Sequence, residues 1–377
     1  MLFSEVQGND YIKRKLIHMI DDKRISHALL FNGPEGSAKL QLALAFATYL
    51  NCKNRNNGDA CGKCPSCTQI SKLAYPDLHF IFPVGNSKLK KVKEPMSVDF
   101  MDEWRSFVET WNGLGTFYDW TNEIRIESGQ AIINTNDCNG IIKTLNYTSY
   151  DSNYKIMVLW MAETIFHAAA PKILKILEEP PENTLFLIIT ENKDAILDTI
   201  ISRVQVVNIP EYTNEDVRNI LVNNYEIDIN EAYKISESTD GNASLAIKTA
   251  LSPEDPLMSF DLFIQWMRIC LRPNMMEIIP FAEEISKNGR ESCVMFLKNS
   301  LTYLRQALFY NETNEFLIPV NGENELTFTK FAKFVRCDNI AIFDNYIENA
   351  ISHIKRNGFI PLIMLNLTVS LCRAFKQ

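Results

Sequence analysis

Four cysteines near the start of the sequence have the spacing that most clearly predicts chemistry. Cys52, Cys61, Cys64 and Cys67 follow the pattern C-x8-C-x2-C-x2-C. In a protein of a reducing compartment, two overlapping C-x-x-C pairs are typical of a tetrahedral Zn²⁺ site. An iron–sulfur cluster and a set of redox-active thiols are the competing interpretations. Because four protein ligands leave no open coordination position, we expect a structural metal rather than a catalytic one.

A second group of residues follows the arrangement of a phosphate-binding loop. That loop reads Gly, four residues, Gly-Lys and then Ser or Thr, and it joins a strand to a helix. Here Gly33, Gly36 and Lys39 stand between a short apolar run and a segment rich in Ala and Leu. The second glycine of the motif is replaced by Ala38, and the hydroxyl residue that should reach Mg²⁺ is replaced by Leu40. The pattern favours a degenerate loop over a working ATP site, and it leaves open whether Lys39 still contacts a phosphate.

Two long apolar runs predict the sheet that must carry these residues. Tyr154–Met161 and Leu185–Thr190 have strand length and no polar alternation, as in a parallel sheet that is covered on both faces. A segment of helical period lies between them and ends at Pro180-Pro181. Ser202-Arg203 follows the second run, so we expect an arginine near the edge of this sheet.

These segments resemble the clamp-loader branch of the AAA+ ATPases, the subunits that open a ring-shaped sliding clamp and close it on primed DNA. The resemblance rests on LKILEEPPENTLFLIIT and the following TIISR. In that branch a Ser-Arg-Cys signature stands at the place of Ser202-Arg203-Val204. Bacterial members also have a zinc-binding insertion after the first helix of the sheet domain, where the four cysteines lie here.

The resemblance implies a fold of the class α/β followed by all-α. We expect an AAA+ P-loop-type parallel sheet domain over residues 1–210, with a zinc module at 51–68 and an insertion at 85–128. A small helical lid domain is expected over 211–252, and a helical collar domain, which joins the subunits of the loader, over 257–377. Within the insertion we predict one helix near 98–111. Its aromatic residues are expected to form a small local core or to pack on a neighbouring subunit, rather than to stack on bases.

The resemblance also identifies four catalytic positions at which this chain lacks the required residue. An active member ends its third strand with Asp-Glu, which orients Mg²⁺ and polarises the attacking water. Trp160 and Met161 occupy those positions, and neither can bind a metal or accept a proton. Leu40 replaces the hydroxyl residue that reaches Mg²⁺, and Ser244 replaces the lid arginine. Since these four losses lie in three separate segments, we predict a subunit without intrinsic ATPase activity.

The arginine of the signature is retained. In this family it acts in trans, because it reaches the γ-phosphate of ATP that is bound to the neighbouring subunit. We therefore predict a non-catalytic stator that uses Arg203, with Ser202 beside it, on an adjacent motor subunit. The implied partners are gamma/tau and delta subunits, with the sliding clamp and primed DNA reached through the complex. The alternative is an ATP-hydrolysing motor subunit of the gamma/tau type, and a third reading is a zinc-containing adaptor that binds nucleic acid alone.

The composition of the chain limits which of these functions it can have. The chain has 377 residues, of which 46% are hydrophobic and 22% are charged, as in globular proteins of two or three domains. Its net charge of −8 argues against a protein that coats DNA by itself. The sequence has no apolar run of the length that a membrane helix needs and no signal-peptide pattern at its start, so we expect a cytoplasmic protein that does not engage a membrane.

Overall fold

The computed structural model describes residues 1–146, 154–251, 260–287, 289–314, 316, 322–356 and 358–375. These residues form two compact units, which are described separately. The sheet unit comprises 1–220 together with 241–245, and the helical unit comprises 221–240 together with the residues from 246 onward. The expected linker between lid and collar, at 253–256, lies outside the described residues. The division into three domains therefore stays a prediction.

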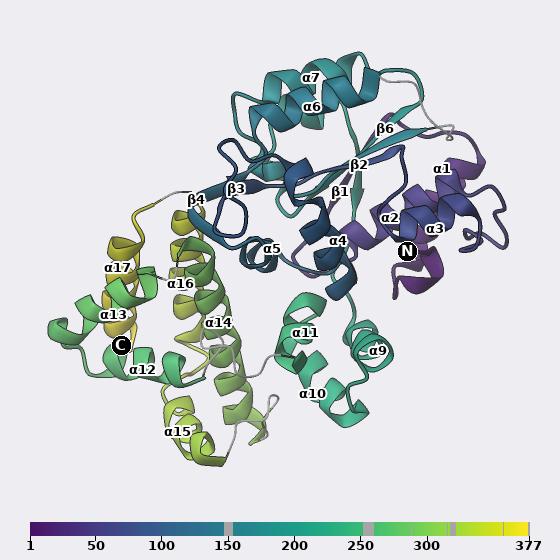
Figure 1. The fold of residues 1–377 in the computed structure, drawn as a ribbon. Coiled ribbons are helices and arrows are strands. Elements are labelled where there is room, and N and C mark those ends of the chain that lie inside the picture. Colours follow the sequence, from purple (N-terminus) through teal and green to yellow (C-terminus); the bar gives the residue numbers. More distant parts are fainter. Residues whose placement is uncertain are drawn as a thin grey trace. The chain divides into compact units, whose positions relative to one another are not determined.

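The sheet unit contains seven strands and the helices that cover them (Figure 1). Its strands are β1 (Ala28–Asn32), β2 (Leu78–Ile81), β3 (Val84–Ser87), β4 (Ile126–Ile132), β5 (Lys155–Leu159), β6 (Thr184–Thr190) and β7 (Gln205–Asn208). Its α-helices are α1 (Asp10–Asp21), α2 (Lys39–Asn51), α3 (Pro65–Ser71), α4 (Met101–Thr110), α5 (Phe117–Glu123), α6 (Thr135–Asn146), α7 (Ala170–Glu178) and α8 (Asp198–Ile201). Short 3₁₀ turns are η1 (Phe3–Glu5), η2 (Ser97–Phe100), η3 (Ala162–Thr164) and η4 (Lys193–Ala195).

The main sheet has five parallel strands in the order β2-β5-β6-β1-β7. All residues of β5 and β6 are buried, which explains their unbroken apolar runs. Ala28 pairs with Phe186 and Lys155 with Thr184, so β1 and β5 flank β6 in register. The parallel sheet that the apolar runs predicted is confirmed.

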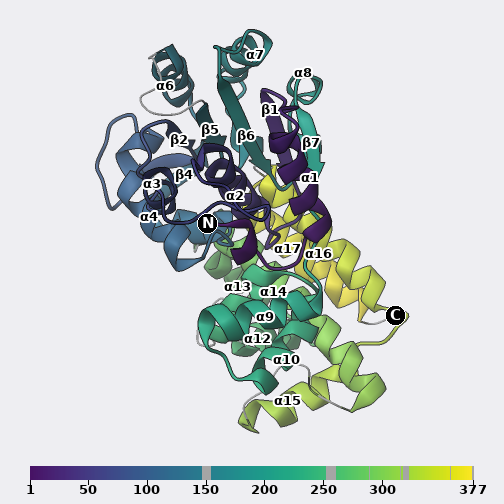
Figure 2. The same ribbon diagram turned by 90° about the vertical axis from the view of Figure 1, so that its right-hand side faces the viewer.

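Helices cover both faces of this sheet (Figures 1 and 2). On one face α6, α7 and α8 contribute Ile141, Ile173 and Ile200 to a core with Leu30, Met157 and Phe186. On the other face α2 packs against β1 and β6. Every residue of α2 is buried, since further segments of the chain cover its outer side. Pro171 lies in the first turn of α7, where its missing N–H removes no helical hydrogen bond.

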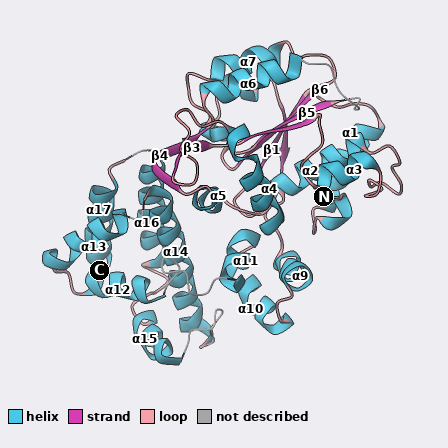
Figure 3. Cartoon of the chain, in the orientation of Figure 1, coloured by secondary structure: helices cyan, strands magenta, loops and turns pink. Residues whose placement is uncertain are grey.

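The insertion contains more structure than the sequence predicted (Figure 3). The expected helix is present as α4, but α5 and the antiparallel pair β3–β4 were missed. Trp104, Phe107 and Trp120 are fully buried among one another and Phe82. The predicted small aromatic core is therefore confirmed for these residues, and no base could stack on their buried rings.

Helices alone form the helical unit, apart from connecting turns, within its described residues. They are α10 (Ile229–Thr239), α12 (Phe260–Leu271), α13 (Met275–Lys287), α14 (Arg290–Thr313), α15 (Gly322–Ala332), α16 (Ile340–Lys355) and α17 (Ile360–Ala374). The division between the units passes through α9 (Asn214–Tyr225) and α11 (Ala243–Leu251). Trp266 lies in the core, and its indole N–H donates to Thr368 Oγ1 over 2.9 Å. The predicted fold class, α/β followed by all-α, is confirmed.

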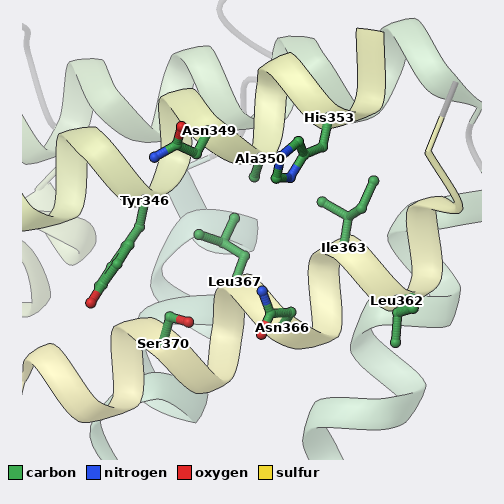
Figure 4. Close-up of a pocket in the computed structure, with 9 residues that line it drawn as sticks. All are labelled: Tyr346, Asn349, Ala350, His353, Leu362, Ile363, Asn366, Leu367 and Ser370. Carbon is green, nitrogen blue, oxygen red and sulfur yellow. The ribbon is translucent and has the colours of Figure 1, made fainter. Parts of the chain in front are cut away.

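A pocket of about 480 Å³ opens between α16 and α17 (Figure 4). Its wall includes Tyr346 and His353 from α16, and Leu362 and Asn366 from α17. The side chains of Leu362 and the neighbouring Phe359 are largely exposed.

Candidate functional sites

The four predicted metal ligands meet at the end of α2. Cys52 is the residue that terminates α2, Cys61 lies in the following loop, and Cys64 and Cys67 belong to the first turn of α3. Their sulfur atoms all lie within 4.8 Å of one another. A tetrahedral ion with Zn–S bonds of about 2.3 Å needs sulfurs about 3.8 Å apart. The Sγ atoms of Cys61 and Cys67 are 4.0 Å apart, so this cluster could hold a metal ion.

Backbone groups around the cluster favour the thiolate form that a metal needs. The N–H of Cys61 donates to Cys52 Sγ over 3.2 Å, and the N–H of Cys64 donates to Cys61 Sγ over 3.3 Å. Donation from the N–H groups of Lys63 and Cys64 lowers the pKa of the Cys61 thiol to about 6. Burial instead raises the pKa of Cys67, so in the free thiol form its sulfur resists ionisation. The donor set fits a thiophilic cation, and the identity of that cation as zinc stays a proposal.

The polar loop between the first two ligands is tied to the rest of the sheet unit. The Asp59 carboxylate accepts hydrogen bonds from the N–H groups of Phe3 and Ser4, over 3.0 and 2.8 Å. Arg55 Nε donates to the carbonyl of Tyr49 over 2.8 Å, near the end of α2. The loop therefore joins the N-terminal turn to α2, but it buries little apolar surface of its own.

The degenerate phosphate loop is packed closely against its neighbours. A Cβ on Gly33 would come within 2.5 Å of the Ile209 carbonyl oxygen, so no larger residue fits there. Gly36 has a φ of +74°, and a Cβ on it would lie 2.1 Å from Asn242 Oδ1. Asn242 belongs to the segment Gly241–Leu245, where the family's lid arginine would be expected. That segment thus lies directly on the tip of the loop, and the residue at the arginine position, Ser244, is buried.

Lys39 is buried and its ammonium group is engaged within the chain. It donates to the Pro34 carbonyl and lies 3.3 Å from Ser37 Oγ. Its Nζ is also 3.9 Å from Glu191 Oε1, at the end of β6. Leu40, which replaces the Mg²⁺-binding hydroxyl residue, is 2% exposed and belongs to the core. Loop and lysine have the predicted positions, but the charge of Lys39 is already balanced by a carboxylate.

Trp160 and Met161 follow β5 directly, as the alignment on the third strand predicts, and both are buried. The indole of Trp160 packs on Trp104 at 5.1 Å and on Phe107 at 5.6 Å between ring centroids. An active relative has its Mg²⁺-binding acid at the position of Trp160. In this chain the Trp160 side chain is instead part of the aromatic core of the insertion.

Glu163 lies just beyond these residues and points to the end of β6. Its carboxylate accepts from Thr190 Oγ1 over 2.8 Å and from the N–H of Glu191 over 3.0 Å. Glu163, Thr190 and Glu191 therefore connect the end of β5 to Lys39. Sequence reasoning missed this connection, and it missed that Trp160 and the insertion share one core.

Ser202 and Arg203 follow the short helix α8 at the surface of the sheet unit. Arg203 Nη1 donates to the Thr199 carbonyl over 2.8 Å and to Ser202 Oγ over 3.2 Å. Its Nη2 forms an ion pair with Glu178 Oε1 at 2.6 Å. The Arg203 side chain is still 35% exposed, so a group from outside the chain can reach it.

Residues 8–213 match the family described as "DNA polymerase III, delta subunit", which is more than half of the chain. The chain belongs to this clamp-loader family of DNA polymerase III. The match covers the phosphate loop, the four cysteines, the insertion and Arg203.

Curated relatives of this clamp-loader chain include two kinds of subunit. It is 27% identical to the DNA polymerase III subunit delta' of Bacillus subtilis over 52% of this chain and 45% of that protein. It is also 27% identical to the subunit gamma/tau of Mycobacterium tuberculosis over 53% of this chain and 27% of that protein. The chain thus spans less than half the length of these relatives, and similarity alone does not separate the two kinds.

Two solved structures from Thermotoga maritima are also similar. A DNA polymerase III gamma subunit-related protein aligns with a TM-score of 0.44 at 14% identity, over 96% of this chain and 99% of that one. The RuvB Holliday junction branch migration motor aligns with a TM-score of 0.40 at 11% identity, over 82% and 79%. Among the described residues of the clamp-loader chain, no helix is both long and apolar enough to cross a membrane.

Replacing Trp160 by aspartate should destabilise the sheet unit by at least about 4 kcal/mol, because the change removes a buried indole and leaves a carboxylate without a partner. Equilibrium denaturation of Trp160→Asp against the wild type measures this loss. Val98→Asp is the matched control, since Val98 belongs to the same insertion but is 66% exposed. Equal stability of the two variants would show that Trp160 is not a core residue.

Proposed function

We propose that this chain is a delta prime subunit: a non-catalytic stator of the DNA polymerase III clamp loader. It would join gamma/tau and delta subunits in the complex that closes the sliding clamp on primed DNA. In this role it presents Arg203 to ATP held by the adjacent motor subunit and does not hydrolyse ATP itself. A cytoplasmic location is part of the same proposal.

The environment of Trp160 is the observation that carries this proposal. A motor subunit needs a carboxylate at this position to orient Mg²⁺ and its water shell. Trp160 is 2% exposed and packed at an angle against two aromatic rings of the insertion, so a side chain from elsewhere has no space to replace it. The adjacent Met161, and Leu40 and Ser244 from two other segments, support the same conclusion, because each is buried and none can supply the missing group.

Arg203 supports the trans role by its chemistry and its exposure. A planar guanidinium that is always charged can stabilise the charge of a transferring phosphoryl group through two parallel hydrogen bonds. Ser202 Oγ accepts from Arg203 Nη1 and so helps to hold the guanidinium at the surface.

The remaining features have structural roles in this proposal. A Zn²⁺ ion bound by Cys52, Cys61, Cys64 and Cys67 would supply folding energy to a loop that has almost no core. Residues 257–377 of the helical unit would act as the collar, and the exposed apolar residues near α17 suit burial against other subunits.

A motor subunit of the gamma/tau type is the alternative, and one observation favours it. The gamma/tau relative is as similar to this chain as the delta prime relative is, since each is 27% identical over about half of the chain. The two proposals differ in whether the isolated chain hydrolyses ATP.

The isolated chain should show no ATP turnover above a blank that lacks protein, with or without primed DNA. The reason is that Leu40 and Trp160 leave Mg²⁺ without its two protein ligands. A coupled ATPase assay on the purified chain measures this, with Lys39→Ala as the control for contaminating enzymes. Steady hydrolysis that Lys39→Ala abolishes would favour the motor-subunit alternative.

Assembly tests the stator proposal directly. The protein should be mixed with the gamma/tau and delta subunits of its own organism and the product weighed by native mass spectrometry. We expect one copy of this chain in a complex with both partners. Failure to enter any such complex would contradict the proposed function.

A further inference from the structure

The guanidinium of Arg203 is held by three acceptors from three positions in the chain. Nη2 contacts Glu178 Oε1 at 2.6 Å, while Nη1 contacts the Thr199 carbonyl at 2.8 Å and Ser202 Oγ at 3.2 Å. Thr199 and Ser202 belong to α8 and its end, whereas Glu178 is the last residue of α7. Of these three acceptors among the described residues, Glu178 is the one that contacts the arginine from outside its own helical turn.

The position of Glu178 is set by the packing and hydrogen bonding of the residues next to it. The preceding residue, Leu177, is buried in the core beneath α7. The N–H of Glu179 still bonds to the Lys175 carbonyl over 3.1 Å, and Pro180-Pro181 then prevents another helical turn. The carboxylate of Glu178 thus stands at the end of α7, beside α8.

The three contacts leave part of the guanidinium available. A guanidinium has five N–H donors in one plane, and the contacts above use three of them. Two donors remain, which is the number that a bidentate contact with phosphate oxygens needs. Because the group is planar, an acceptor that fixes Nη2 also fixes the direction in which the remaining donors point.

We propose that Glu178 is a positioning residue for Arg203: it orients the guanidinium before a neighbouring subunit presents ATP. This inference rests on the proposed trans role of Arg203. Glu178 would not touch the nucleotide. Its effect comes from holding the arginine in one orientation, so that less side-chain freedom is lost when the phosphate arrives.

Four variants test the proposal in the reconstituted loader with clamp and primed DNA: Arg203→Ala, Glu178→Ala, Glu178→Gln and Glu179→Ala. The rate lost with Arg203→Ala defines the share of ATP hydrolysis that depends on this arginine. We expect Glu178→Ala to reduce that share about 10-fold, which is less than the roughly 100-fold that a 1 Å misplacement can cause. Glu178→Gln should retain most of it, since the amide oxygen still accepts from Nη2.

Glu179→Ala is the matched control, because it removes the same charge from the adjacent residue of the same turn and should leave the rate unchanged. The KM for ATP should stay at the wild-type value while kcat falls, since the arginine acts on the transition state rather than on ATP binding. A purely structural role for Glu178 would instead lower the amount of assembled complex or its melting temperature.

The outcomes separate this inference from the proposed function. If Arg203→Ala lowers the rate but Glu178→Ala matches or exceeds the wild type, Glu178 does not position the arginine, and the ion pair merely holds it back. If Glu178→Gln loses as much as Glu178→Ala, the charge of Glu178 matters rather than its hydrogen bond, and positioning by that bond is wrong. If Arg203→Ala itself has no effect, the trans mechanism fails and this inference fails with it.

Discussion

Removal of the metal from the cysteine cluster should unfold residues 50–70 while the helical unit keeps its structure. Structural Zn²⁺ in small domains contributes about 10–16 kcal/mol of apparent binding free energy, which is also folding free energy. The loop from Lys53 to Ala60 has little core to replace that contribution. The purified protein should contain one Zn²⁺ per chain by elemental analysis, and hydrogen exchange should show loss of protection around Cys52–Ile70 after treatment with a chelator.

Cysteine variants make the same test specific. Cys64→Ser should release the ion and raise hydrogen exchange in the same segment. Cys337→Ser serves as the control, since Cys337 is an exposed thiol of the helical unit. Protein that purifies without zinc, or with iron and visible absorbance, would contradict the zinc assignment. The melting of the helical unit should be the same in all of these samples.

The cysteine cluster also shows what can be predicted from the sequence. The spacing of the four cysteines predicts that they meet, because a C-x-x-C pair is too short to serve two separate sites, and their sulfur atoms do lie together. The strands β5 and β6 were predictable for a similar reason, since an apolar run of strand length is typical of a parallel sheet that is covered on both faces. In each case the information lies within one short segment of the chain.

The missed features depend on contacts between segments that are distant in sequence. β4 contains polar residues and a glycine, so its sequence does not look like a strand. α5 begins at a capping box formed by Thr116 and Asp119, but with seven residues the helix is too short to be predicted from its sequence alone. Trp160 could be recognised as a non-catalytic residue, but its packing on Trp104 depends on a residue of the insertion 56 positions earlier. The pairing of Arg203 with Glu178 likewise joins the ends of two helices, and no spacing rule predicts it.

Replacing Arg203 by alanine should leave this chain folded and able to join the loader, while lowering the ATPase rate of the assembled complex on primed DNA with clamp. An arginine that acts in trans contributes about 10³–10⁵ in rate at a single site. In the proposed loader, other ATP sites would have their own arginines, so the expected loss in the total rate is smaller. Arg203→Lys should also lose most of the contribution that Arg203 makes to the ATPase rate, because an ammonium group cannot reproduce the planar fork of N–H donors.

The competing explanation is that Arg203 serves only to form its ion pair with Glu178. Both side chains are exposed by more than a third, and an exposed pair of this kind contributes at most about 1 kcal/mol to stability. If Arg203 served only this pair, its loss would leave the ATPase rate of the neighbouring subunit unchanged. Arg105→Ala is the matched control, since Arg105 also forms an exposed ion pair, with Asp102 at 2.8 Å, and has no proposed partner outside the chain. If the reconstituted loader with Arg203→Ala loads clamps as fast as the loader with Arg105→Ala and the wild-type loader, the trans mechanism is wrong. The reason is that no other exposed group in the signature can stabilise the transferring phosphoryl charge.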